Sequence, residues 1–210
     1  ELQEVFKTQN WSGEILNTAG DYLLWADANL GAMKTDLVIT RTLSYEIVPT
    51  SSGKYLAKVS MNYEHSGSFD WRTTRYRSYA RVYVPEGSKL VSAEGAMEKD
   101  KSTKPGKVDS GRELNREWFG AFISIEPGQT KKLSFTYLLP DKIGEQIKNG
   151  QYSLFVQKQL GIIRTDLKLK LDFGKLVKSA SPGEDKNRHG DNIYELTKKI
   201  SSDSEFIVKF

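Results

Sequence analysis

"DLVITRTLSYEIVP", residues 36–49, decides how this chain folds. Apolar and polar side chains alternate along it, which is the two-residue period of a β-strand with one buried face. The positions predicted to be buried are Leu37, Ile39, Leu43, Tyr45 and Ile47, against Val38, Thr40, Thr42, Ser44 and Glu46 on the other face. Arg41 is the exception, because a charged side chain stands there on the apolar side.

The next stretch, "KYLAKVSMNYEH" (54–65), alternates in the same way, and the "TSSG" before it is typical of a hairpin turn. Further strands, about ten in all, are predicted at 76–84, 88–94, 117–125, 130–138, 151–159, 165–173, 191–198 and 204–210. A single internal segment, 141–150, has helical spacing, with Asp141 expected as its N-cap and Gly150 as its end.

Because strands follow strands without regular helices between them, the sequence predicts a mainly all-β fold, an antiparallel β-sandwich that is Ig-like or related. Residues 20–210 are expected to form this domain, and residues 1–19 a short helical lead from a preceding region. Two polar stretches, 99–115 and 179–192, interrupt the alternation and are predicted to be mobile surface loops.

Composition narrows the classes of function. The chain has 210 residues, of which 38% are hydrophobic, enough for a sizeable core. Its net charge of +4 comes from mixed signs without a nucleic-acid-binding motif, which argues against a nucleic-acid partner. The absence of cysteine excludes disulfides and thiolate sites. There is no long apolar run and no signal-type segment, so we expect a soluble piece of a longer protein whose anchor lies upstream.

The candidate binding surface is the stretch "TTRYRSYARVYVPEG" (73–87). Its outward-facing side chains are predicted to be Arg75, Arg77, Tyr79, Arg81 and Tyr83, with Arg72 and Trp71 in the loop before them. Guanidinium groups between aromatic rings suit the phosphates or carboxylates of a polymer, and they suit a protein contact as well. The alternative is a solvated sheet face whose arginines meet acidic neighbours. Of the four tryptophans, Trp71 is expected to be the most exposed.

Metal and catalytic sites have weaker signals. "EDKNRHGDN" (184–192) gives Asp185, Asn187, His189 and Asp191 as weak metal-ligand candidates, although such clusters are more often turn formers. "WADANLG" (25–31) with Asp36 resembles the opening of a calcium loop but lacks later ligands. Neither His65 nor His189 has a catalytic spacing, and nothing selects a carboxylate pair. The sequence therefore predicts no catalytic site and no cofactor.

Several blocks together resemble a known family. "YRSYARVYVPEGSKLVSAEG" (76–95), "FGAFISIEPGQTKKLSFTYLLP" (119–140) and "YSLFVQKQLG" (152–161) occur in the order found in the C-terminal region of a prokaryotic envelope family, domain of unknown function 4012. The resemblance extends over essentially the whole chain. It implies an extracytoplasmic, cell-surface module of a protein whose N-terminal membrane anchor lies outside this sequence.

These observations lead to two functional hypotheses. The first is a non-catalytic scaffold or interaction domain whose partner is an anionic envelope polymer or another envelope protein. The alternative is an accessory domain of an enzyme that modifies envelope polysaccharide or another cell-wall polymer, with its catalytic part upstream. Binding that weakens with salt, or turnover by the longer parent chain, would distinguish them.

Overall fold

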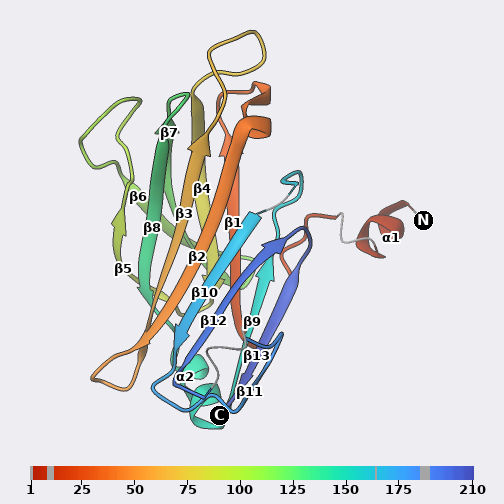
Figure 1. Ribbon diagram of the computed structural model, residues 1–210, viewed down its shortest axis with the longest axis vertical. Coiled ribbons are helices and arrows are strands. Elements are labelled where there is room, and N and C mark those ends of the chain that lie inside the picture. The colour runs from red at the N-terminus through yellow and green to blue at the C-terminus, as the bar shows by residue number, and fades with distance from the viewer. Residues whose placement is uncertain (1, 9–11, 164, 185–189) are drawn as a thin grey trace.

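The computed structural model describes residues 2–8, 12–163, 165–184 and 190–210. In this part of the chain thirteen strands form two sheets that pack face to face (Figure 1). Sheet A has the order β11 (Ser179–Ser181), β13 (Ser204–Lys209), β9 (Gln151–Gln157), β1 (Asp21–Asn29), β4 (Tyr76–Pro85), β7 (Arg116–Ile125) and β6 (Val108–Glu113). Sheet B has the order β12 (Ile193–Ile200), β10 (Thr165–Asp172), β2 (Ile39–Pro49), β3 (Tyr55–His65), β8 (Thr130–Leu138) and β5 (Lys89–Glu94).

The mainly all-β sandwich is confirmed, and most of its strand pairs are antiparallel, but two pairs run parallel. β1 runs parallel to β9, with Asp21 opposite Leu154, and β2 runs parallel to β10, with Leu43 opposite Leu167. The other pairs are antiparallel, including the predicted hairpin of β2 and β3. Alternation shows which face of a strand is buried, whereas the direction of a neighbour that is distant in sequence depends on the path between them.

Three strands lie where none was predicted. In β1 all of residues 21–25 are buried, so the strand has no alternation to detect. β6 lies inside the stretch 99–115 and β11 inside 179–192, both of which were predicted to be loops. These two edge strands are polar, and their position comes from pairing with β7 and β13. The predicted start of the strand at residue 36 is also corrected, because Lys34–Val38 forms a 3₁₀-helix, η1.

Two short α-helices accompany the sheets. α1 (Leu2–Thr8) belongs to the predicted helical lead, of which residues 1 and 9–11 lie outside the described residues. α2 (Asp141–Lys148) buries Ile143 and Ile147 against the sandwich. The prediction that Asp141 caps α2 is wrong: Pro140 is the N-cap, and Asp141 is the first helical residue, where its charge favours the positive end of the helix. The helix ends before Gly150, which has a φ of +92°.

The core lies between the sheets and is rich in aromatic rings. The Phe135 ring has its centroid 5.7 Å from that of Trp25 and 6.3 Å from that of Phe119, and the Tyr152 and Phe173 centroids are 4.9 Å apart. Each such side chain, when fully buried, stabilises the fold by about 1.5–3 kcal/mol. The alternating strands of the sequence are thus the inner faces of the sandwich.

A second apolar cluster covers part of the outer face of sheet A. Tyr22, Leu24 and Tyr83 are its buried members, and Ile15 packs against them from the segment before β1. Gln157 holds that segment by donating its side-chain amide to the Glu14 carbonyl oxygen at 2.8 Å. This cover explains why β1 is buried on both of its faces.

Candidate binding surfaces

The arginine and tyrosine row begins at Arg75, directly before β4, and continues along β4, where acidic residues face it from other elements. Arg75 pairs with Glu126 and with Asp100, and the Arg77 guanidinium lies 2.7 Å from the Asp100 carboxylate. The hydrogen bond from Arg75 holds the pKa of Glu126 below its ordinary value.

The rest of the row is paired in the same way. Arg81 lies 3.2 Å from Glu113 and 4.2 Å from the centroid of the Trp118 ring. The hydroxyl groups of the two tyrosines donate to carboxylates, Tyr79 to Asp109 and Tyr83 to Glu113, each at 2.7 Å. Every outward-facing side chain of the row thus has an acidic partner, so an anionic polymer would have to displace carboxylates in order to bind there. Polymer binding by this row stays a prediction.

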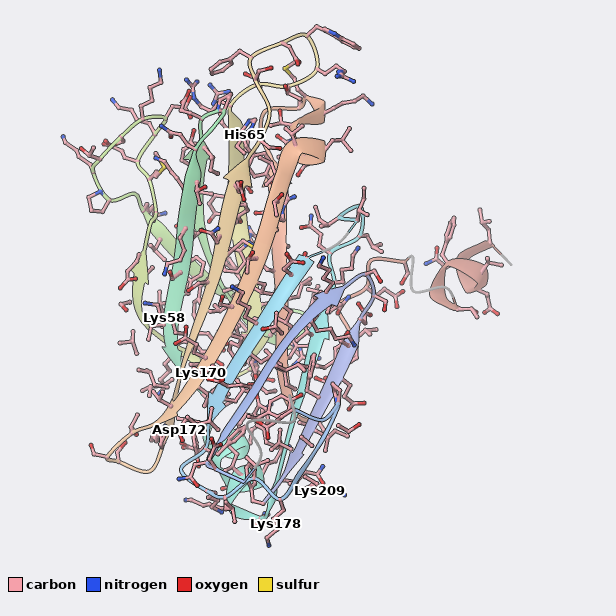
Figure 2. All side chains as sticks on the ribbon, in the orientation of Figure 1. Lys58, His65, Lys170, Asp172, Lys178 and Lys209 are labelled. Atoms are coloured by element: carbon pink, nitrogen blue, oxygen red, sulfur yellow. The ribbon has the colours of Figure 1, made fainter. Side chains whose placement is uncertain are left out.

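Trp71 and Arg72, the other two predicted binding residues, come before the row in the sequence, in the loop whose last residue is Arg75. They belong to the loop 66–75 between β3 and β4, which extends from the same end of the sandwich as His65 (Figure 2). Trp71 is 83% exposed and Phe69 is 62% exposed, which confirms the predicted exposure of Trp71. The Arg72 guanidinium carbon lies 5.2 Å from the centroid of the Trp71 ring. We call residues 66–75 the aromatic loop.

Hydrogen bonds inside the aromatic loop fix its backbone. One Asp70 carboxylate oxygen accepts the backbone N–H groups of Arg72 and Thr73, each at 2.7 Å. The hydroxyl group of Thr73 donates to the Ser68 carbonyl oxygen at 2.7 Å, and the Asp70 N–H donates to the Thr73 carbonyl oxygen at 3.0 Å. These backbone hydrogen bonds to Asp70 lower its pKa. Trp71 therefore lies on a closed turn with few free torsions.

Neighbouring elements hold the base of the aromatic loop. The Lys34 N–H donates to the Arg72 carbonyl oxygen at 3.0 Å, and the Thr74 N–H donates to the hydroxyl group of Thr35 at 3.2 Å, so η1 and the loop support each other. The buried His65 ring donates from Nε2 to the Thr74 carbonyl oxygen at 2.8 Å and accepts the Gly67 N–H at Nδ1. Both ring nitrogens of His65 are engaged in structural hydrogen bonds.

A buried polar cluster lies beneath this end of the sandwich, centred on Arg41. The Arg41 and Asp27 side chains are 3% and 2% exposed, and Nε of Arg41 lies 3.0 Å from the Asp27 carboxylate. The other Asp27 carboxylate oxygen accepts the hydroxyl groups of Tyr63 at 2.6 Å and Ser78 at 2.9 Å. This cluster explains why a charged residue, Arg41, stands on the apolar side of β2.

The same cluster accounts for the calcium-loop resemblance. A terminal Arg41 nitrogen donates to Asp36 at 2.6 Å and to the hydroxyl group of Tyr76 at 2.7 Å. Asn29 donates to the other Asp36 oxygen at 2.7 Å. Asp27 and Asp36 therefore converge on a guanidinium group, and Asn29 holds Asp36 in place. Within the described ranges, no group of three histidine, cysteine, aspartate or glutamate residues could hold a metal ion.

Of the weak metal candidates, Asp185, Asn187 and His189 lie outside the described residues. Asp191 is described, and its carboxylate accepts the backbone N–H of Ile193 at 2.8 Å, as a turn-forming residue does. The metal prediction for this stretch therefore rests on the sequence alone.

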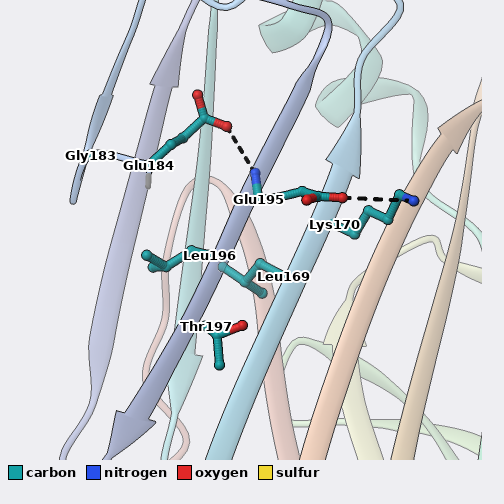
Figure 3. Close-up of a pocket in the computed structure, with 7 residues that line it drawn as sticks. All are labelled: Leu169, Lys170, Gly183, Glu184, Glu195, Leu196 and Thr197. Atoms are coloured by element: carbon teal, nitrogen blue, oxygen red, sulfur yellow. Dashed lines mark hydrogen bonds and ion pairs between the residues drawn. The ribbon is translucent and has the colours of Figure 1, made fainter. Parts of the chain in front are cut away.

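A hollow of about 480 Å³ lies on the surface of sheet B, beside β10 and β12 (Figure 3). Glu184 accepts the backbone N–H of Glu195 at 2.9 Å, and the Glu195 carboxylate lies 3.7 Å from the Lys170 ammonium group. Since both acids have fixed contacts, we assign no chemistry to this hollow.

In the part of the chain that the structure describes, no helix is long and apolar enough to cross a membrane.

No family model and no curated protein sequence matches this chain. Among solved structures, a protein from Legionella pneumophila described as a candidate nutrient-binding protein is similar to it, with a TM-score of 0.50 and 7% identity over 90% of this chain and 71% of that one. At this identity the likeness shows a shared fold.

Two peptidase-type structures are also similar. A candidate protease from Parabacteroides distasonis has a TM-score of 0.40 with 10% identity over 83% of this chain and 41% of that one. An M1 zinc metallopeptidase from Deinococcus radiodurans has a TM-score of 0.32 with 11% identity over 92% of this chain and 43% of that one. This chain spans less than half of either protein, and we draw no functional argument from them.

Proposed function

We propose that this chain is a non-catalytic binding module that engages a protein partner through the aromatic loop. The observation that carries the proposal is the exposure of Trp71 on a backbone fixed by internal hydrogen bonds. Tryptophan and arginine are enriched among the residues that dominate binding energy at protein interfaces. A loop that is already ordered loses little conformational entropy when it binds, so more of the contact energy appears as affinity.

The shape and charge of this end favour a protein over an anionic polymer. Phe69 and Trp71 are exposed on a loop, and an exposed aromatic residue of this kind fits an apolar pocket on a partner. The arginines of the β4 row are already paired with acids, which weakens their attraction for a polyanion. Arg72 adds a cation beside Trp71, and a partner with an acidic rim would complement it.

The hydrogen bonds of the polar groups at this end of the sandwich indicate that these groups have a structural role. Asp27 accepts three hydrogen bonds or ion pairs from fixed partners, and His65 uses both ring nitrogens. The hydrogen bonds of these groups go to other parts of the fold, which supports a structural role for them. We further propose, from the family resemblance, that the parent protein is membrane-anchored and presents this module outside the cytoplasm.

Replacing Trp71 by alanine should weaken binding at least tenfold without lowering the melting temperature, because the side chain contacts little in the free protein. The purified domain would be co-sedimented with isolated envelopes of its own cell, and the bound fraction measured against protein concentration. Leu176→Ala is the matched control, since Leu176 is also an exposed apolar residue, 53% exposed, but lies outside the aromatic loop.

The nature of the partner is tested in the same assay. Treating the envelopes with protease should abolish binding if the partner is a protein. Binding that survives protease but falls with salt would assign the partner to the anionic polymers. Equal binding by wild type and Trp71→Ala would remove the aromatic loop from the interface and overturn the proposal.

A further inference from the structure

We propose that a cleft beside η1 binds a small amphipathic molecule that carries a primary ammonium group. The cleft has a volume of about 330 Å³ and lies between η1, the first residues of β2 and the connection from β9 to β10. It opens to solvent close to the Arg41 cluster, and Arg41 is one of its lining residues. This volume is within the usual range of small-molecule sites.

Aliphatic and polar side chains share the walls of the cleft. Four aliphatic side chains contribute to them: Leu37, Ile39, Ile162 and Ile163. Two of these side chains, Leu37 of η1 and Ile163 of the connection from β9 to β10, are 71% and 78% exposed. A bound alkyl chain would cover both of them, and burial of apolar area is the main favourable contribution that such a site can make.

The polar groups of the cleft require a hydrogen-bond donor. Asp166, the second residue of β10, has one carboxylate oxygen that is shielded from water and has no hydrogen-bond partner within the described residues. A shielded carboxylate oxygen without a donor is unfavourable, and an N–H group of a ligand would remove this cost once the Asp166 carboxylate rotated toward the cleft. Arg41 does not supply the donor, because its hydrogen bonds go to Asp27, Asp36, the Tyr76 hydroxyl group and the Ile39 carbonyl oxygen.

The charge at the cleft favours a cation over a neutral donor. The described carboxylates in and directly behind its wall are Asp27, Asp36 and Asp166. They are opposed by Arg41 and by Lys199, which is opposite Asp166 in the register of β10 and β12. A primary ammonium has three N–H donors and a full positive charge. It would therefore both donate a hydrogen bond to the Asp166 carboxylate and reduce the excess negative charge at the cleft. The ammonium group of Lys199, opposite Asp166, would compete with the ligand for the Asp166 carboxylate.

The experiment titrates the protein with hexylammonium chloride and compares it with 1-hexanol and sodium hexanoate, which share its alkyl chain. Amide shifts in ¹H–¹⁵N spectra would be followed at Thr40, Gly161, Ile163 and Asp166. Hexylammonium should shift these amides and bind at least tenfold more tightly than hexanol. Asp166→Asn should remove this preference, whereas Asp172→Asn, toward the opposite end of the same strand (Figure 2), should keep it.

Three results would overturn the proposal. Equal affinity for the three probes would show an apolar surface without selection for a cation. Shifts confined to residues away from the cleft would place binding elsewhere. An unchanged preference in Asp166→Asn would show that the carboxylate does not recognise the ammonium group. Trp71→Ala should leave the titration unchanged, so this result is independent of the proposed partner site.

Discussion

Replacing Arg41 by methionine should lower the free energy of unfolding by about 3–5 kcal/mol, the usual effect of removing one partner of a buried ion pair. The Asp27 carboxylate is 2% exposed and would then be left with hydroxyl donors alone. Asp36 would also lose its contact with the guanidinium group. Methionine retains much of the length and apolar volume of arginine, so the loss would report the charge and not a cavity.

Denaturant unfolding near neutral pH measures this effect. The double variant Asp27→Asn with Arg41→Met should recover a large part of the loss, because it leaves no unpaired charge at the buried position. Arg81→Met is the control on the surface, where an exposed ion pair contributes at most about 1 kcal/mol. A loss below about 1 kcal/mol in Arg41→Met would contradict a structural role for the cluster.

Asp21 should make the stability of the protein fall as pH rises from 3 to 7. Its side chain is fully buried, and one carboxylate oxygen accepts the hydroxyl groups of Tyr45 at 2.7 Å and Tyr152 at 2.6 Å. Burial raises the pKa of Asp21 from 3.8 to about 6, because it outweighs these hydrogen bonds. The folded state therefore favours the protonated form, and this advantage is lost as pH rises from 3.8 through 6.

This pKa difference corresponds to about 3 kcal/mol of unfolding free energy between pH 3 and pH 7. Other acids also titrate there, so the quantity to measure is the stability of Asp21→Asn minus that of wild type. It should rise with pH by about 3 kcal/mol, since asparagine does not ionise. Asp70→Asn should change in the opposite direction, because the pKa of Asp70 is lowered in the folded state. A flat Asp21→Asn difference would contradict the account of this buried carboxyl.

The alternating stretches were sufficient to predict the sandwich and several of its strands. Residues 130–138 form β8 as predicted, and the two strands around "TSSG" pair as a hairpin. Local pattern was insufficient for β1, whose outer face is covered by residues from the preceding segment, and for the parallel neighbours of β1 and β2. The burial of an outer face and the direction of a neighbouring strand both depend on residues far away in the sequence. A two-residue period carries no information about them.

The candidate sites were predictable to a smaller extent. The exposure of Trp71 follows from its position between Asp70 and Arg72, but the hydrogen bonds that fix its loop could not be read from the sequence. The acids that face the arginine row come from other segments, such as Asp100 and Glu126. Arg41 was the one local signal of the buried cluster, since a charge on an apolar face requires a buried partner.

The central claim is that the chain presents Trp71 to a partner on a loop that is already ordered before binding. Backbone ¹⁵N relaxation of the free protein tests it most directly, because order parameters report motion of each amide on the picosecond to nanosecond timescale. The account predicts values of about 0.85 for residues 68–74, as for a rigid backbone such as that of β3 and β4. Values below about 0.6 at Trp71 and its neighbours would show a flexible loop and contradict the claim.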